Sequence, residues 1–140
     1  MRVVLDTDVI VAALRSPAGA SAALRRAVRT GKLEIVINVP LAMEYEVVCR
    51  QGRHVAASGL SPHEVDIYIS TVIAMAKATP TYFAWHPQLR DPADEFVLDA
   101  AINERVNALI TFNRADYGSG PGRFGIEVLL PREALQRIKS

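Results

Sequence analysis

Carboxylate side chains recur just after the predicted strands of this sequence, and they are the residues best suited to chemistry. Asp6 directly follows the first apolar run, and Asp8 comes two residues later. Asn113 and Asp116 lie just past the end of a later predicted strand. In open sheets of parallel strands, ligands bind outside the carboxyl ends of the strands. The order of residues therefore predicts a polar site at one edge of a sheet.

Two further acids lie on predicted helices. Glu44 is in the helix after the second strand, and Asp94 is in the first turn of the helix before the fourth strand. Carboxylates brought close together repel each other and force some of the groups to protonate, unless a cation neutralises them. Oxygen ligands favour Mg²⁺ or Mn²⁺ over zinc. Such a site activates a water molecule and neutralises charge that develops on a phosphate.

Most of these residues also have a simpler structural interpretation. Asp8 suits the N-cap of a helix beginning at Val9 as well as it suits a ligand role. Asn113 and Asp116 are residue types that commonly form loops. Asp6 is different, because a lone carboxylate after four residues of buried strand is costly to desolvate without a function.

Each of the two acids on predicted helices has an alternative interpretation. Glu44 and Glu46 are two residues apart, so they cannot face the same way on a helix, and the residues alone barely distinguish them. Asp94 could complete a helix cap begun at Asp91, but it also heads the apolar face of its helix. Asp99 is expected on the exposed face.

Short apolar runs alternate with helical patterns along the whole chain. The predicted strands are 2–5, 33–38, 79–84, 107–112 and 127–130. The predicted helices are 9–14, 19–30, 40–51, 61–77, 91–106 and 131–139. Strands separated by helices form βαβ units and a parallel sheet with helices on both faces. We therefore expect one α/β domain over residues 1–140, a three-layer sandwich with a mostly parallel sheet of four to five strands.

Composition narrows the class of protein. The chain has 140 residues, a net charge of +1 and 50% hydrophobic residues, which argues against disorder and against strong non-specific DNA binding. The single cysteine, Cys49, rules out an intramolecular disulfide framework. No apolar run approaches the roughly 20 residues of a membrane helix, and acids interrupt the first apolar stretch, unlike a signal peptide. We expect a cytoplasmic protein without a membrane partner.

Charge is unevenly distributed near the N-terminus. Residues 9–33 contain no acid, and they carry Arg15, Arg25, Arg26, Arg29 and Lys32. Either these residues form an ordinary solvated helix face, or they form a patch for nucleic acid or an acidic partner. The three histidines, His54, His63 and His86, fall outside the acidic motifs. They are interpreted as surface or packing residues.

Four segments together resemble the PIN-domain family of metal-dependent nucleases, and more narrowly its VapC-like toxins. The segments are MRVVLDTDVI, LAMEYEVVCR, DPADEFVLDAAINERVNALITFNRADY and FGIEVLLPREAL. The first three carry an acid in the place of each of the family's first three acids. The third segment, with its T-x-N-x-x-D ending, is the most specific.

The resemblance implies endonucleolytic cleavage of RNA with Mg²⁺ or Mn²⁺ as cofactor. The acidic metal site would consist of Asp6, Glu44, Asp94 and Asp116. Asn113 would assist a metal or the substrate, and Thr7 and Thr111 would shape the site through hydroxyl hydrogen bonds. Asp8 is a departure, because the family commonly has Asn there. Its extra charge could tighten cation binding or repel RNA.

The resemblance also implies a cognate antitoxin protein and a homodimer. Two other functions stay open. A haloacid-dehalogenase-like phosphatase would use Asp6 as phosphoryl acceptor and Asp8 as acid and base, but the chain lacks a convincing site lysine. A catalytically weak PIN-like module would bind RNA or a protein partner without cleavage.

Overall fold

A five-stranded parallel sheet forms the centre of the computed structural model, which describes residues 1–80 and 92–139. The strands are β1 (Arg2–Leu5), β2 (Glu34–Ile37), β3 (Lys77–Ala78), β4 (Ala108–Ile110) and β5 (Glu127–Leu129). Their order in the sheet is β3-β2-β1-β4-β5, and every pairing is parallel. The expected α/β class and parallel sheet are confirmed. β1 is the middle strand of the sheet. Its carboxyl end therefore lies at the centre of the edge that the carboxyl ends of all five strands form.

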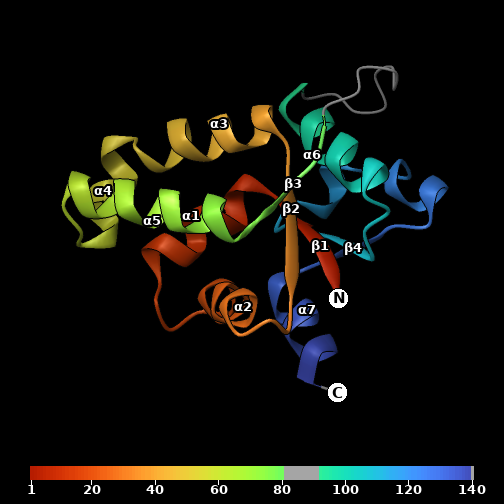
Figure 1. Cartoon of the computed structure of the whole chain (residues 1–140), viewed down its shortest axis with the longest axis horizontal. Coiled ribbons are helices and arrows are strands. Elements are labelled where there is room, and N and C mark those ends of the chain that lie inside the picture. The colour runs from red at the N-terminus through yellow and green to blue at the C-terminus, as the bar shows by residue number, and fades with distance from the viewer. Residues whose placement is uncertain (81–91, 140) are drawn as a thin grey trace.

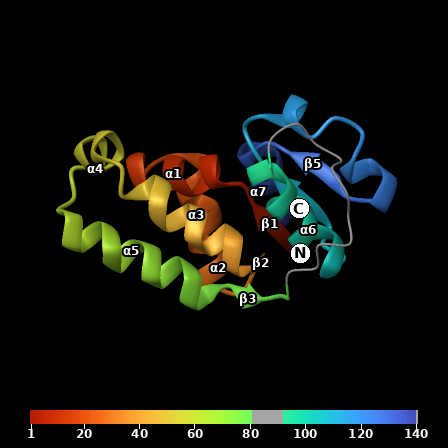
Figure 2. The same ribbon diagram turned by 90° about the horizontal axis from the view of Figure 1, so that it is seen from above.

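Helices surround this sheet and make up most of the remaining described chain. They are α1 (Thr7–Arg15), α2 (Ala20–Arg29), α3 (Val39–Cys49), α4 (Gly52–Ser58), α5 (Pro62–Met75), α6 (Pro92–Asn103) and α7 (Pro131–Lys139). Figures 1 and 2 show α1, α3, α4 and α5 gathered at one end of the molecule, with the start of α3 lying next to α6. Along the described residues, no helix has the length and apolarity needed to cross a membrane.

The central strands are buried on both faces, so their sequences need no alternation of apolar and polar residues. Val3 and Val4 in β1 and Leu109 and Ile110 in β4 are completely buried. Such continuous apolar runs are typical of parallel strands covered by helices. Tyr45 of α3 adds a polar tie, because its hydroxyl donates to the carbonyl of Leu5 at the end of β1. This contact fixes α3 against the edge where β1 ends.

The first helix begins two residues earlier than predicted. Asp6 has an extended backbone, with φ −64° and ψ 155°, and is the N-cap of α1. One of its carboxylate oxygens accepts a hydrogen bond from the backbone N–H of Thr7 at 2.8 Å. The expectation that Asp8 could cap this helix is wrong, because β1 ends at Leu5 and leaves the cap position to Asp6. Asp8 lies in the first helical turn.

The third strand is displaced from its predicted range. It covers Lys77–Ala78, where the helix 61–77 was expected to end, and α5 stops at Met75. Pro80 has no backbone N–H and cannot continue the ladder, which explains why the strand does not reach it. Residues 81–84 of the predicted strand lie outside the described residues.

A short helix, α4, occupies a stretch for which no element was predicted. The helix begins at Gly52 and ends at Ser58. Gly59, which follows it, has a φ of 73°. Glycine adopts this left-handed conformation readily and often follows the last helical residue. Two glycines seven residues apart resemble a loop in sequence, and only packing against α1 and α3 supports a helix between them.

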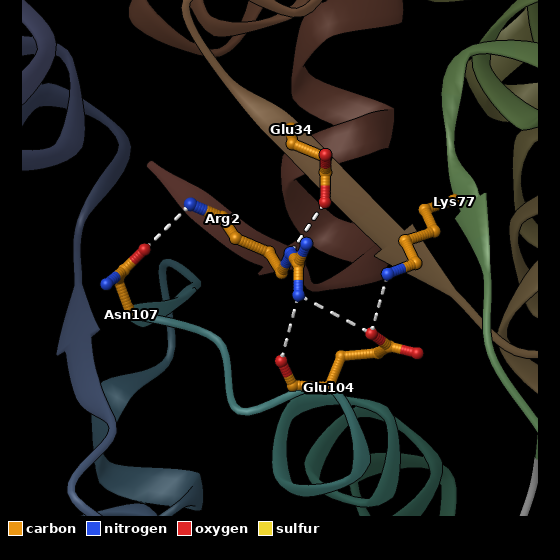
Figure 3. Close-up of polar contacts among 5 residues, drawn as sticks. All are labelled: Arg2, Glu34, Lys77, Glu104 and Asn107. Atoms are coloured by element: carbon orange, nitrogen blue, oxygen red, sulfur yellow. Dashed lines mark hydrogen bonds and ion pairs between the residues drawn. The ribbon is translucent and has the colours of Figure 1, made fainter.

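An ion-pair network joins the amino ends of the strands (Figure 3). Arg2 contacts Glu34 at 2.6 Å and Glu104 at 3.6 Å, and Lys77 contacts Glu104 at 3.1 Å. Asn107 accepts a hydrogen bond from the backbone of Arg2. These residues begin or precede β1, β2, β3 and β4, so the network lies at the edge opposite the predicted site. The network holds the amino ends of these strands together, and the candidate functional residues lie at the opposite edge, where the strands end.

Candidate active site

Asp6 is a buried carboxylate held by three hydrogen bonds. It is 8% exposed and lies where β1 ends and α1 begins. One oxygen accepts from the backbone of Thr7, and the other accepts from the Thr111 hydroxyl at 2.8 Å and the Tyr117 hydroxyl at 2.9 Å. Donors of this kind compensate for the desolvation of a charged group. The carboxylate is therefore fixed in one orientation at the centre of the sheet edge.

Thr7 connects Asp6 to the acid on α3. The Thr7 hydroxyl donates to a carboxylate oxygen of Glu44 at 2.8 Å, while its backbone N–H donates to Asp6. Glu46 lies on another side of the helix and pairs with Arg50 at 3.8 Å. The structure therefore brings Glu44 to the site and leaves Glu46 outside it. The Thr7 hydroxyl thus holds the Glu44 carboxylate beside Asp6.

Tyr117 connects Asp6 to the acid on α6, and the sequence analysis missed it. Its hydroxyl lies 3.4 Å from a carboxylate oxygen of Asp94 and donates to Asp6. The side chain is fully buried. Burial, followed by the charges of Asp6 and Asp94, raises the pKa of Tyr117 far above its ordinary value. The phenol therefore keeps its proton and is a permanent donor between the two carboxylates.

Thr111 is polarised between the backbone and Asp6. Its hydroxyl accepts from the backbone N–H of Asn113 at 3.0 Å. It has one proton, and Asp6 at 2.8 Å is a closer acceptor than Asp8 at 3.3 Å. Thr111 therefore donates to Asp6, and Asp8 depends on other donors.

Asp8 lies beside this group and is only partly satisfied. One oxygen accepts from the backbone N–H of Phe112 at 3.1 Å and from the side-chain amide of Asn113 at 2.9 Å. The other oxygen is buried and has no hydrogen-bond partner among the described residues. Burial, followed by the charge of Asp6, raises the pKa of Asp8 to about 6. The site thus contains a carboxylate that is destabilised in its charged form.

Asp116 does not join the hydrogen-bonded group. It ends a short 3₁₀ turn, Arg114–Asp116, and its side chain is exposed. The next residue, Tyr117, turns inward instead. Asp99, expected on the exposed face of α6, is 7% exposed and therefore buried, so that expectation is wrong. Asp91, a proposed helix cap, lies outside the described residues.

Comparison with known protein families identifies the family that the chain matches. A domain model described as PIN domain matches residues 2–115. The chain belongs to the PIN domain family. PIN domains are generally nucleases, a kind of hydrolase, and they typically use divalent metal ions. A search of the curated proteins finds no match to the chain.

The match covers most, but not all, of the predicted acids of this PIN domain. It includes Asp6, Glu44 and Asp94 and ends one residue before Asp116. The first three are also the acids that Thr7 and Tyr117 join into one group. The three acids that the structure brings together therefore all lie within the matched residues.

The donor chemistry of this PIN domain fits a divalent cation. The group offers carboxylate oxygens and hydroxyls without nitrogen or sulfur, which suits Mg²⁺ or Mn²⁺. The buried, unpartnered oxygen of Asp8 is an additional acceptor. As placed, no three His, Cys, Asp or Glu side chains in the described part of the chain are arranged to hold a metal ion. In this arrangement Thr7 and the Tyr117 hydroxyl lie between Asp6 and the other two acids.

The raised pKa of Asp8 leads to a prediction about stability. An acid whose folded-state pKa is above its unfolded value of 3.8 destabilises the fold as pH rises through this interval. We expect Asp8→Asn to be more stable than wild type by about 1–3 kcal/mol at pH 7.5 in EDTA, and the difference to disappear near pH 4. Urea unfolding across this pH range measures it. EDTA is needed because a bound cation would stabilise the charged form.

Asp66→Asn is the control for this experiment. Asp66 lies on α5 and pairs with Arg50 at 2.8 Å, so its removal takes away a favourable partner of a charged group. It should give no gain in stability at high pH. A difference between Asp8→Asn and wild type that does not change from pH 4 to pH 7.5 would contradict the prediction.

Proposed function

We propose that this PIN domain is a Mg²⁺- or Mn²⁺-dependent endoribonuclease of the VapC-like type. The observation that carries the proposal is the group around Asp6, in which Thr7 and Tyr117 join acids from three elements. Thr7 links it to Glu44, and Tyr117 links it to Asp94. A buried carboxylate with two further acids close to it suits a site that binds a cation and a phosphate.

The residues divide into two roles in this proposal. Asp6, Glu44 and Asp94 would hold the cation, and Asp116, which is exposed and precedes Tyr117, would complete the set from the solvent side. When bound, the cation would neutralise charge on the phosphate and activate a water molecule. Thr7 and Thr111 orient carboxylates, and the amide of Asn113 holds Asp8.

We also propose the biological setting that the resemblance implies. The chain would be the toxin of a cytoplasmic toxin–antitoxin pair, act as a homodimer and be restrained by a cognate antitoxin protein. A binding module is the second candidate function. It is favoured by the exposure of Asp116 and by the absence of a preformed metal-binding arrangement among the described residues.

Cleavage of a pool of single-stranded and structured RNA tests the proposal. Purified protein is incubated with Mg²⁺, Mn²⁺ or EDTA, with DNA of the same sequences in parallel. We expect metal-dependent cutting of RNA that Asp94→Asn abolishes and that Glu95→Gln, the neighbouring acid on α6, retains. Cleavage that persists in Asp94→Asn would overturn the assigned site.

The same assay separates the second candidate. RNA binding that persists in EDTA, with no cleavage by the folded wild type at any metal concentration, would favour the binding module. Preferential cutting of DNA would keep the nuclease and reject RNA as its substrate.

A further inference from the structure

A cationic cluster lies at the end of α1 that points away from the acids. A guanidinium nitrogen of Arg15 is 3.3 Å from Nδ1 of His54, and Nε of Arg53 is 3.4 Å from Nε2 of the same ring. His54 is 8% exposed, whereas both arginines are exposed. The imidazole is thus packed between two guanidinium groups that reach solvent.

This arrangement has more donors than acceptors. A guanidinium group only donates, and a neutral imidazole accepts through only one of its two nitrogens, so both contacts cannot be hydrogen bonds. No carboxylate pairs with Arg15 or Arg53 within residues 1–80 and 92–139. Burial, then the charges of Arg53 and Arg15, lower the pKa of His54. An anion with several oxygens would supply the missing acceptors.

A partly exposed line of residues on α1 leads from the acidic site to this cluster. Most of the helix is buried, and the residues that reach its surface are Asp8, Ala12 and Arg15. Their spacing of four and then three residues places them on one face of the helix. Figure 2 shows α1 leading from the end of β1 toward α4, which carries Arg53 and His54. At 1.5 Å per residue, Asp8 and Arg15 are about 10 Å apart along the helix.

We propose that Arg15 and Arg53 bind a backbone phosphate of the RNA that lies close to the phosphate that is cleaved. This inference rests on the proposed function. The acids around Asp6 repel an RNA backbone, and the net charge of +1 provides no general attraction. A strand that reaches the acids therefore needs local cations nearby. Arginine is suited to this role, because its planar group binds phosphate through two donors.

Binding of fluorescein-labelled single-stranded RNA in EDTA tests the proposal without requiring cleavage. We expect Arg15→Gln/Arg53→Gln to raise the Kd about tenfold and to reduce the slope of log K against log salt by about 0.7, the value for one phosphate contact. Arg26→Gln/Arg29→Gln is the control, because it removes the same charge from exposed positions on α2. It should have little effect.

The outcomes separate the two proposals. If the wild type binds RNA but does not cut it with any metal, and Arg15→Gln/Arg53→Gln weakens binding, the phosphate site stands and the nuclease fails. If the wild type cuts RNA and the variant binds as tightly as wild type, the phosphate site fails alone. No binding of RNA by the wild type, or equal weakening in the control, also overturns it.

Two additional arms complete the experiment. Poly-L-glutamate serves as an acidic protein-like probe, and loss of its binding with unchanged RNA binding would assign the cluster to an acidic protein instead. Arg15→Lys/Arg53→Lys keeps both charges and removes the planar donors. It should weaken RNA binding less than the glutamine variant, and it replaces that variant if the latter does not fold.

Discussion

Asp6→Asn should reduce RNA cleavage by about 10³-fold or more while the protein stays folded. The carboxylate lies at the centre of the acidic group, and its charge is what a cation would bind. Losing several kcal/mol of charge stabilisation in the transition state corresponds to this factor. Asparagine has the same shape and can still accept from the backbone N–H of Thr7. The rate of cleavage at saturating Mg²⁺ is the measurement.

The control for Asp6→Asn comes from the opposite edge of the sheet. Glu34→Gln removes a carboxylate that pairs with Arg2 in the network at the strand starts. This pair is partly exposed, so its loss should cost less than about 1 kcal/mol of stability and leave cleavage unchanged. Equal loss of activity in both variants would mean that net charge or folding, rather than the site, limits cleavage. Thermal unfolding of both variants separates these cases.

The sheet was largely predictable because its strands are buried on both faces. The apolar runs of β1, β2 and β4 have no solvated face, so residue type alone indicates a strand there. α7 begins and ends at its predicted residues, Pro131 and Lys139, because proline marks the first turn. β3 was misplaced because its two residues, Lys77 and Ala78, are exposed and neither is of the β-branched or aromatic type that favours strands.

The acids were predictable in part, and the hydroxyl groups that join them less so. Asp6 was identified by its position after a buried strand, whereas the choice of Glu44 over Glu46 needed the resemblance. Tyr117 could not be found from the sequence. It follows a loop, belongs to no periodic pattern, and its role depends on a turn that directs it inward while Asp116 faces solvent. Only the path of this turn in three dimensions shows that Tyr117 points inward and that Asp116 faces solvent.

Tyr117→Phe should therefore reveal how the hydroxyl and the cation compete for the same carboxylates. In metal-free protein, the phenol donates to Asp6 and lies beside Asp94. Its removal should lower the free energy of unfolding by about 1.5–3 kcal/mol, the contribution of a buried hydrogen bond to a charged group. Phenylalanine retains the ring, so packing is preserved. Urea unfolding in EDTA measures the loss.

Mg²⁺ should restore part of this stability, and the restoration is the decisive observation. A cation that binds the folded state stabilises it by an amount that increases with the logarithm of its affinity, and in the variant it no longer competes with the Tyr117 hydroxyl for Asp6. The increase in stability from EDTA to saturating Mg²⁺ should therefore be larger for Tyr117→Phe than for wild type. Tyr68→Phe, which removes a hydroxyl bound to the carbonyl of Ile10, is the matched control and should show no such difference. If Mg²⁺ stabilises all three proteins equally, the Tyr117 hydroxyl supports the fold and has no part in metal binding.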